Sequence, residues 1–270
     1  MKNLLFWMVL IVGIVVLLGS CAKKKDESTT ATATATTAAS TGGCGNLTEV
    51  SSCSSTPSGS ITGIDNQTLT GVFSTMHIYG ILGTPSGIDN TTDCISNTSL
   101  LASMAASIGS PTGALGLIIN TRVTSSTSMS KVNIWYSDAT CSTEMARMNN
   151  GLSNVAVGAD VTGLATSVGS NTYSSTANIV TYDMDCMEIK ASNDAGATWL
   201  KTFLSGGSVN PVVGETHYCR NAAGSQYALM HLDNDTYGGG AYGMGLYWED
   251  SSSAQPTAWS SSTDTMTFLP

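Results

Sequence analysis

The chain has 270 residues, of which 10 are basic and 19 are acidic, so its formal net charge is −9. Serine, threonine, glycine and alanine dominate the chain after the first twenty residues, a composition that excludes a coiled coil or a helical bundle. Four of the ten basic residues precede position 26, so the rest of the chain is acidic, and nucleic acid is excluded as a partner.

The first 20 residues have the pattern of a secretory signal peptide. Lys2 precedes an apolar run from Leu4 to Leu18, and the small residues Gly19 and Ser20 follow. A membrane-spanning helix needs about 20 apolar residues, so the run is too short to span a bilayer. We therefore expect residues 1–20 to direct export and then to be removed.

The end of this segment, Leu18-Gly19-Ser20-Cys21, resembles the lipobox of bacterial lipoproteins. The resemblance implies that Cys21 is acylated and becomes the first residue of the mature protein. Buried acyl chains contribute about 0.8 kcal/mol per methylene, so two or three chains give a lasting membrane anchor. Because Ala22 rather than aspartate follows, the resemblance also implies the outer membrane of the cell envelope.

Residues 21–43 are expected to be the lipidated cysteine followed by a disordered tether. The stretch is rich in Thr, Ala and Ser and has no apolar residue larger than alanine after Cys21, so it cannot form a core. As a flexible coil it spans roughly 25 Å. Residues 44–270 then form a single β-rich domain, because no proline-rich or charged linker interrupts them.

Six cysteines lie in this domain, an even number in a chain that is expected to be exported. Disulfide bonds are the default interpretation in an oxidising compartment. Fifteen pairings are open, and we expect Cys44 with Cys53, Cys94 with Cys141, and Cys186 with Cys219. The cysteines are Cys44, Cys53, Cys94, Cys141, Cys186 and Cys219.

Short segments rich in β-branched and aromatic residues, separated by Gly, Ser, Asn and Asp turns, predict the strands. They cover residues 72–82, 114–124, 131–137, 177–182, 184–191, 198–204, 215–219, 226–232, 241–248 and 265–269. Their regular spacing favours an all-β fold, either an antiparallel β-sandwich or a β-barrel. Within 131–136, strict alternation predicts a half-buried strand with Val132, Ile134 and Tyr136 on one face.

One or two short helices are expected beside the sheet. An apolar stripe from Leu100 to Ile108 predicts a helix that is capped within residues 97–99 and stopped at Gly109. A weaker helical turn is predicted over residues 143–149, where Met145 and Met148 share a face. Two similar pieces, residues 63–66 and 87–90, are predicted to be turns.

The segment Ser192-Asn193-Asp194-Ala195-Gly196-Ala197-Thr198-Trp199 resembles the Asp-box of sialidases and other secreted β proteins. The resemblance implies a structural hairpin whose defining residues are Ser192, Asp194, Gly196, Thr198 and Trp199. In such a hairpin the Asp194 carboxylate would cap the turn and Trp199 would pack beneath it. A single copy favours a structural role over glycan hydrolysis.

The turn Tyr136-Ser137-Asp138-Ala139-Thr140-Cys141 is similar to a Tyr-x-Asp-x-x-Cys turn in lipocalin-like bacterial β-barrels. That resemblance implies a barrel with a cup for a small ligand. The entrance motif of that family would place Trp near the first strand, where this chain has Phe73.

Several acidic residues and histidines are candidates for reactive groups. Asp233 and Asp235 alternate as in a calcium loop, and a solvated turn is the competing interpretation. Asp183 and Asp185 share one face of a predicted strand, as paired catalytic carboxylates would. The histidines have no ligand spacing and are interpreted as ordinary strand residues: His77, His217 and His231. We expect no catalytic residue and no cofactor other than calcium.

Aromatic residues interrupted by glycines occupy residues 237–248. Exposed rings on a rigid sheet can hold sugars or partner side chains, whereas buried rings would fill the core. The candidate ligand-binding residues are Tyr237, Tyr242, Tyr247 and Trp248.

These patterns predict a membrane-anchored surface or periplasm-facing lipoprotein, a non-enzymatic binding module for a glycan, an envelope component or a small ligand. Two alternatives remain open: a secreted hydrolase that acts on glycans, and a structural subunit of an envelope coat or assembly.

The lipobox makes the first testable prediction. Cys21→Ser should abolish lipid labelling and release the protein from the membrane fraction, because the thiol is the acylation site. Radiolabelled fatty acid and fractionation check it. Unchanged membrane attachment of the variant would refute the lipobox interpretation.

Overall fold

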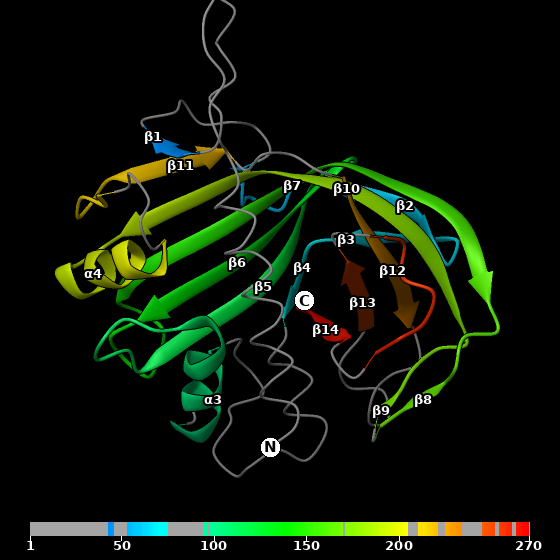
Figure 1. Ribbon diagram of the computed structural model, residues 1–270, viewed down its shortest axis with the longest axis horizontal. Coiled ribbons are helices and arrows are strands. Elements are labelled where there is room, and N and C mark those ends of the chain that lie inside the picture. The colour runs from blue at the N-terminus through cyan, green and yellow to red at the C-terminus, as the bar shows by residue number, and fades with distance from the viewer. Residues whose placement is uncertain are drawn as a thin grey trace, which may run out of the picture.

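The computed structural model describes residues 43–45, 53–74, 94–96, 98–169, 171–204, 210–220, 225–233, 245–251, 254–260 and 263–269. Within these ranges the protein is an antiparallel β structure with two helices, as Figure 1 shows. No helix in the described ranges is long and apolar enough to cross a membrane.

The first seven strands are β1 (Gly43–Gly45), β2 (Ser60–Ile64), β3 (Gln67–Thr70), β4 (Val72–Ser74), β5 (Gly116–Ser125), β6 (Ser128–Tyr136) and β7 (Glu144–Thr162). The remaining strands are β8 (Ser167–Val168), β9 (Asn171–Thr172), β10 (Thr176–Ala191), β11 (Thr216–Arg220), β12 (Ser225–Asp233), β13 (Gly245–Ser251) and β14 (Asp264–Leu269). The helices are α3 (Thr98–Ile108) and α4 (Asp194–Phe203).

Eight of the described strands pair in a closed ring. The order around the ring is β4, β5, β6, β7, β10, β12, β13 and β14, and every pairing is antiparallel. The pairing of Phe73 with Phe268 joins β14 back to β4. The order follows the chain, so the ring is an up-and-down barrel, one of the two architectures that the sequence predicts.

The two longest strands belong to the barrel for only part of their length. Residues 176–183 of β10 pair with β12, whereas residues 186–190 pair with β11, which in turn pairs with β1. Along both parts β10 also pairs with β7, with irregularities in register between residues 178 and 186. One part of this long ribbon therefore curls into the barrel, and the other part continues as an open sheet (Figure 1).

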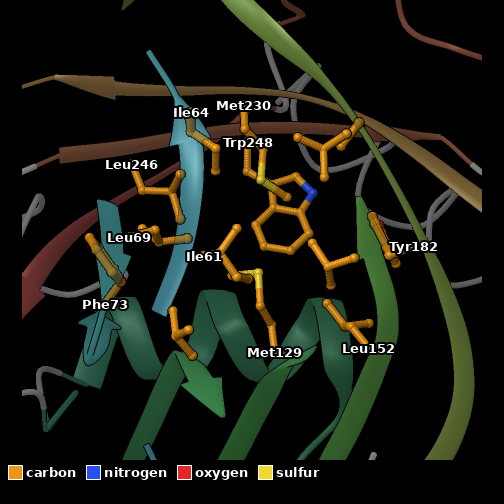
Figure 2. Packing of buried hydrophobic residues seen from close by; sticks show 14 of the residues in the cluster. Ile61, Ile64, Leu69, Phe73, Met129, Leu152, Tyr182, Met230, Leu246 and Trp248 are labelled. Carbon is orange, nitrogen blue, oxygen red and sulfur yellow. The ribbon is translucent and has the colours of Figure 1, made fainter. Parts of the chain in front are cut away.

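The hairpin β2–β3 plugs one end of the barrel. Asp65 at its turn receives a hydrogen bond from Leu232 N (2.8 Å) and donates its own N–H to Asn178 Oδ1 (2.7 Å). Behind the turn, Ile61 and Leu69 are fully buried in the lumen core. Figure 2 shows this core, in which the side chains of the hairpin surround the Trp248 indole together with residues of the barrel wall. The turn predicted at residues 63–66 is confirmed, and its duplicate at 87–90 lies outside the described residues.

The helices cover the open part of the sheet. Leu101 of α3 and Leu200 of α4 belong to one buried cluster with Leu117, Trp135 and other residues of the sheet. The α3 helix is confirmed where the sequence predicts it. The β8–β9 hairpin region and Trp259 form a third cluster with the outward-facing side of β10, β12 and β13.

The helical turn predicted over residues 143–149 is wrong, because this segment begins the long strand β7. The cause is visible in the burial pattern: Met145, Ala146, Met148 and Leu152 are all buried, since both faces of β7 are covered. A strand covered on both faces loses its two-residue alternation and can imitate a helical stripe.

The hairpin predicted at residues 192–199, and the strand predicted at 198–204, are also wrong, because α4 begins there. The capping residue is Asn193, whose Oδ1 accepts the N–H of Gly196 at 2.8 Å, and not Asp194, which lies in the first helical turn. Gly196 is required because a Cβ at this position would collide with the carbonyl of Met145. Trp199 is buried as expected, edge-on to Trp135.

Two disulfides are described, and only one has the expected partners. Cys94 bonds Cys141, as predicted. Cys53 bonds Cys186, so the expected pairs Cys44–Cys53 and Cys186–Cys219 are wrong. The segment that begins at Cys53 runs beside β7 and β5. The carbonyl of Cys53 accepts from the Asn149 side chain, and the carbonyl of Ser55 accepts from the Arg122 side chain. These contacts hold Cys53 near Cys186 and away from Cys44. The register of β1 places Cys44 opposite Cys219, whose sulfur is disulfide-bonded.

The start of α4 gives the second prediction. Asn193→Ala should lower the free energy of unfolding by about 0.5–2 kcal/mol, because it leaves a helix N–H without its cap. Asp194→Ala is the matched control and should cost less, because an exposed acidic residue in the first turn contributes only about 0.3–1 kcal/mol through the helix dipole. Chemical denaturation measures both. A larger loss for Asp194→Ala would restore Asp194 as the capping residue.

Candidate functional site

A charged pair lies inside the barrel. Lys131 is on β6 and Asp250 is on β13, and these strands stand four places apart in the ring of eight, on opposite walls. Lys131 Nζ nevertheless lies 3.1 Å from Asp250 Oδ2. The two side chains can meet only if both point into the lumen, so the ion pair crosses it.

Two aromatic residues support this pair. Lys131 Nζ lies 4.2 Å from the ring centroid of Trp248, and the Tyr182 hydroxyl donates to Asp250 Oδ2 at 3.4 Å. The Tyr182 and Trp248 rings meet edge-on with centroids 5.7 Å apart. A cation over an indole face is attracted by the ring quadrupole. We call Lys131, Asp250, Tyr182 and Trp248 the lumen site.

The charged groups of the lumen site are reached by solvent, while its rings are not. The side chains of Lys131 and Asp250 are 28% and 31% exposed, whereas Trp248 is 1% exposed. Trp248 belongs to the core that the hairpin β2–β3 seals. The pair therefore lies beside this core while its charged groups remain in contact with solvent.

Burial raises the pKa of the Tyr182 hydroxyl well above its usual value, and the negative charge of Asp250 raises it further. Tyr182 is therefore a neutral hydrogen-bond donor near pH 7 and not a base or nucleophile. The lumen site thus combines an ammonium group, a carboxylate and a hydroxyl donor.

The aromatic residues that the sequence selected do not form an exposed platform. Tyr247 is 4% exposed on the outward side of β13, where it packs with Tyr173 and Trp259, and Trp248 is buried in the lumen. Adjacent strand residues point to opposite faces, and here both faces are covered. Of the two interpretations of this stretch, burial in the core is therefore the one that holds for Tyr247 and Trp248. Tyr237 and Tyr242 lie outside the described residues.

The acidic candidates are not brought together into a described site. Asp233 accepts from the Tyr247 hydroxyl at 3.4 Å, and Asp235 lies outside the described residues. Asp183 accepts from Asn154 Nδ2 (2.8 Å) and Ser225 Oγ (3.2 Å) on the barrel surface. The structure describes Asp185 only as a backbone position in β10. In the described ranges, no group of three or more His, Cys, Asp or Glu residues could hold a metal ion.

The histidines have structural contacts. His217 Nε2 accepts from the backbone N–H of Val212, and His231 Nδ1 lies 2.9 Å from Asp65 Oδ2 while its ring stacks on Tyr247. His231 thus helps to hold the hairpin plug, which the spacing of the histidines gave no reason to expect. His77 lies outside the described residues.

The turn with lipocalin-like sequence joins β6 to β7 and is organised by Asp138. Its carboxylate accepts from Thr140 Oγ1 and from the backbone N–H groups of Thr140, Ser142 and Thr143. These hydrogen bonds hold the pKa of Asp138 well below its usual range, and the bond from the Thr140 hydroxyl contributes most. The Cys94–Cys141 disulfide links the same turn to the segment that precedes α3.

Comparison with known proteins provides no family for this chain. No protein-family model matches it, and no curated protein matches it.

Sequence reasoning assigned Lys131 to the polar face of its strand but did not pair it with Asp250. The pair is separated by 119 positions, and no local pattern connects them. The available signal was alternation: Trp248 and Asp250 share a face of one strand, and Lys131 and Trp135 share a face of another. The large apolar rings of Trp248 and Trp135 could have indicated that both of these strand faces point into the barrel.

Asp138 gives the third prediction, a pH dependence. Its pKa is lowered on folding, so it stabilises the protein above the pKa of an unfolded aspartate, about 3.9, and the contribution is lost as the pH falls below that value. Asp138→Asn should therefore lower the melting temperature near pH 6 and have progressively less effect below about pH 4. Thermal unfolding across this range measures it. A difference that stays constant with pH would contradict a role for the charge.

Proposed function

We propose that this protein is a lipid-anchored lipoprotein of the bacterial cell envelope, a non-enzymatic module that binds a small ligand, glycan or envelope component. The observation that carries the proposal is the lumen site: a solvent-reachable ion pair, Lys131 with Asp250, that crosses a barrel whose other end is sealed.

The sealed end supports this location for the ligand. Removing the hairpin plug would expose Ile61, Ile64 and Leu69, each of which contributes about 1.5–3 kcal/mol when fully buried. It would also break the hydrogen bonds of Asp65. That cost is comparable with the total stability of many domains, so a ligand is expected at the end where the ion pair is exposed.

The envelope location is supported by two independent features. The lipobox at residues 18–21 provides the anchor, and the disulfides Cys53–Cys186 and Cys94–Cys141 fit an oxidising compartment. Eight-stranded barrels have an interior that side chains fill or that holds one small ligand, and in this protein the plug fills one part. Tyr182 adds a hydroxyl that donates to Asp250 in the same site.

The fourth prediction tests binding. The mature lipoprotein in detergent micelles should be stabilised against thermal unfolding by at least one class in a panel of glycans, envelope fragments and small metabolites. Lys131→Ala should remove that stabilisation, because it deletes the positive charge of the lumen site. Lys201→Ala, an exposed position on α4, is the matched control and should retain it. The proposal would be contradicted if no compound bound, or if the Lys131→Ala variant kept the full stabilisation.

A further inference from the structure

Cys219 on β11 forms a disulfide whose partner the two bonds described above do not supply. Its sulfur is disulfide-bonded, and the residue is 4% exposed. The described bonds use four other cysteines of the seven in the chain, so Cys21 and Cys44 remain. The partner of Cys219 is therefore one of these two or a cysteine of a second copy of the chain.

The strand register favours Cys44. β1 pairs antiparallel with β11, and Cys44 lies directly opposite Cys219. Residues that stand opposite each other in an antiparallel pair share a face of the sheet, and their Cα atoms are about 4.5–5.5 Å apart. Disulfides join cysteines whose Cα atoms are about 4.4–6.8 Å apart. The backbone therefore places residue 44 within bonding distance of Cys219 without any rearrangement.

The other two partners fit less well. In the proposed lipoprotein the sulfur of Cys21 carries an acyl chain, so it has no thiol to oxidise. A second copy of the chain would have to reach Cys219, which is almost fully buried in the sheet. A cross-strand bond to Cys44 needs neither a free lipobox thiol nor an opening of the sheet.

The surroundings of Cys219 explain what such a bond would do. β1 is only three residues long, and two of them are glycines, which add no side chain to a sheet. Cys219, in contrast, belongs to the apolar cluster beneath the helices and stands opposite Met187 of β10. A bond to Cys219 would therefore connect β1 to a buried core that the residues of β1 do not themselves provide.

We propose that Cys44 and Cys219 form a third disulfide, which staples the end of the tether to the edge of the open sheet. Its formation is a thiol–disulfide exchange with an oxidised thiol oxidoreductase of the export compartment. The two thiols lose two protons and two electrons as the new S–S bond forms, and the S–S bond of the oxidoreductase is reduced to two thiols. The staple is independent of what the lumen site binds.

Disulfide mapping of the exported protein tests the bond. The protein is purified with N-ethylmaleimide, which blocks exchange, and is digested without reductant by trypsin and a glutamate-specific protease. Two peptides then contain one cysteine each: residues 28–49, with Cys44, and residues 216–220, with Cys219. They should appear as one linked species that a reductant separates. A 216–220 peptide that carries N-ethylmaleimide, or that is linked to Cys21 or to a second 216–220 peptide, would overturn the proposal.

Serine variants connect the bond to its two residues. Cys44→Ser should leave Cys219 as a free thiol that is alkylated after denaturation, and Cys219→Ser should leave Cys44 free. Cys94→Ser is the matched control, because it should free Cys141 and keep the 28–49 and 216–220 peptides linked. Cys219 that stays oxidised in Cys44→Ser would overturn the pairing. Mapping of the unaltered protein decides the bond even if a variant is not exported.

Hydrogen exchange tests whether the bond acts as a staple. Without the bond, the short strand β1 should separate from β11 by local opening, so the amides of residues 218–220 lose their cover. In Cys44→Ser these amides should exchange at least about 10-fold faster than in the unaltered protein, because the link no longer limits opening. The amides of β12 are the internal reference and should not change. Equal exchange at residues 218–220 in the two proteins would overturn the stapling role.

Discussion

The pairing of β7 with β10 is the interaction on which the rest of the structure depends. These are the longest described strands, and their register runs from Thr176 opposite Thr162 to Ala191 opposite Ala146. At one end the ribbon joins β12 and closes the barrel, and at the other end it joins β11 and supports the helices. The bulges between residues 178 and 186 mark the transition, as irregularities that bend a strand commonly do.

The two ends of the ribbon explain where a ligand site can exist. The barrel end is filled by the hairpin β2–β3, and the sheet end is covered by α3 and α4. Between these two apolar cores, Lys131 and Asp250 cross the lumen and remain partly exposed. An ion pair in this position contributes little to stability once its desolvation is counted.

The sequence predicted much of the fold because most strands have local signals. The strands at 116–125, 128–136 and 225–233 follow β-branched and aromatic runs closely. It failed at β7, where burial on both faces removed the alternation, and at α4, where a capping Asn193 outweighed a motif typical of hairpins. The lumen site could not be predicted, since Lys131 and Asp250 meet only after eight strands have closed.

The most direct test of this account is the nuclear Overhauser contact between the Lys131 side chain and the Trp248 indole. In the closed barrel the ammonium lies 4.2 Å from the ring centroid, so cross-peaks and ring-current shifts of the Lys131 side-chain protons are expected. In an open sheet, four strand spacings of about 4.8 Å would separate β6 and β13 by roughly 19 Å. Absence of these signals, with contacts between the neighbouring Lys131 and Asn150 retained, would contradict barrel closure and the lumen site with it.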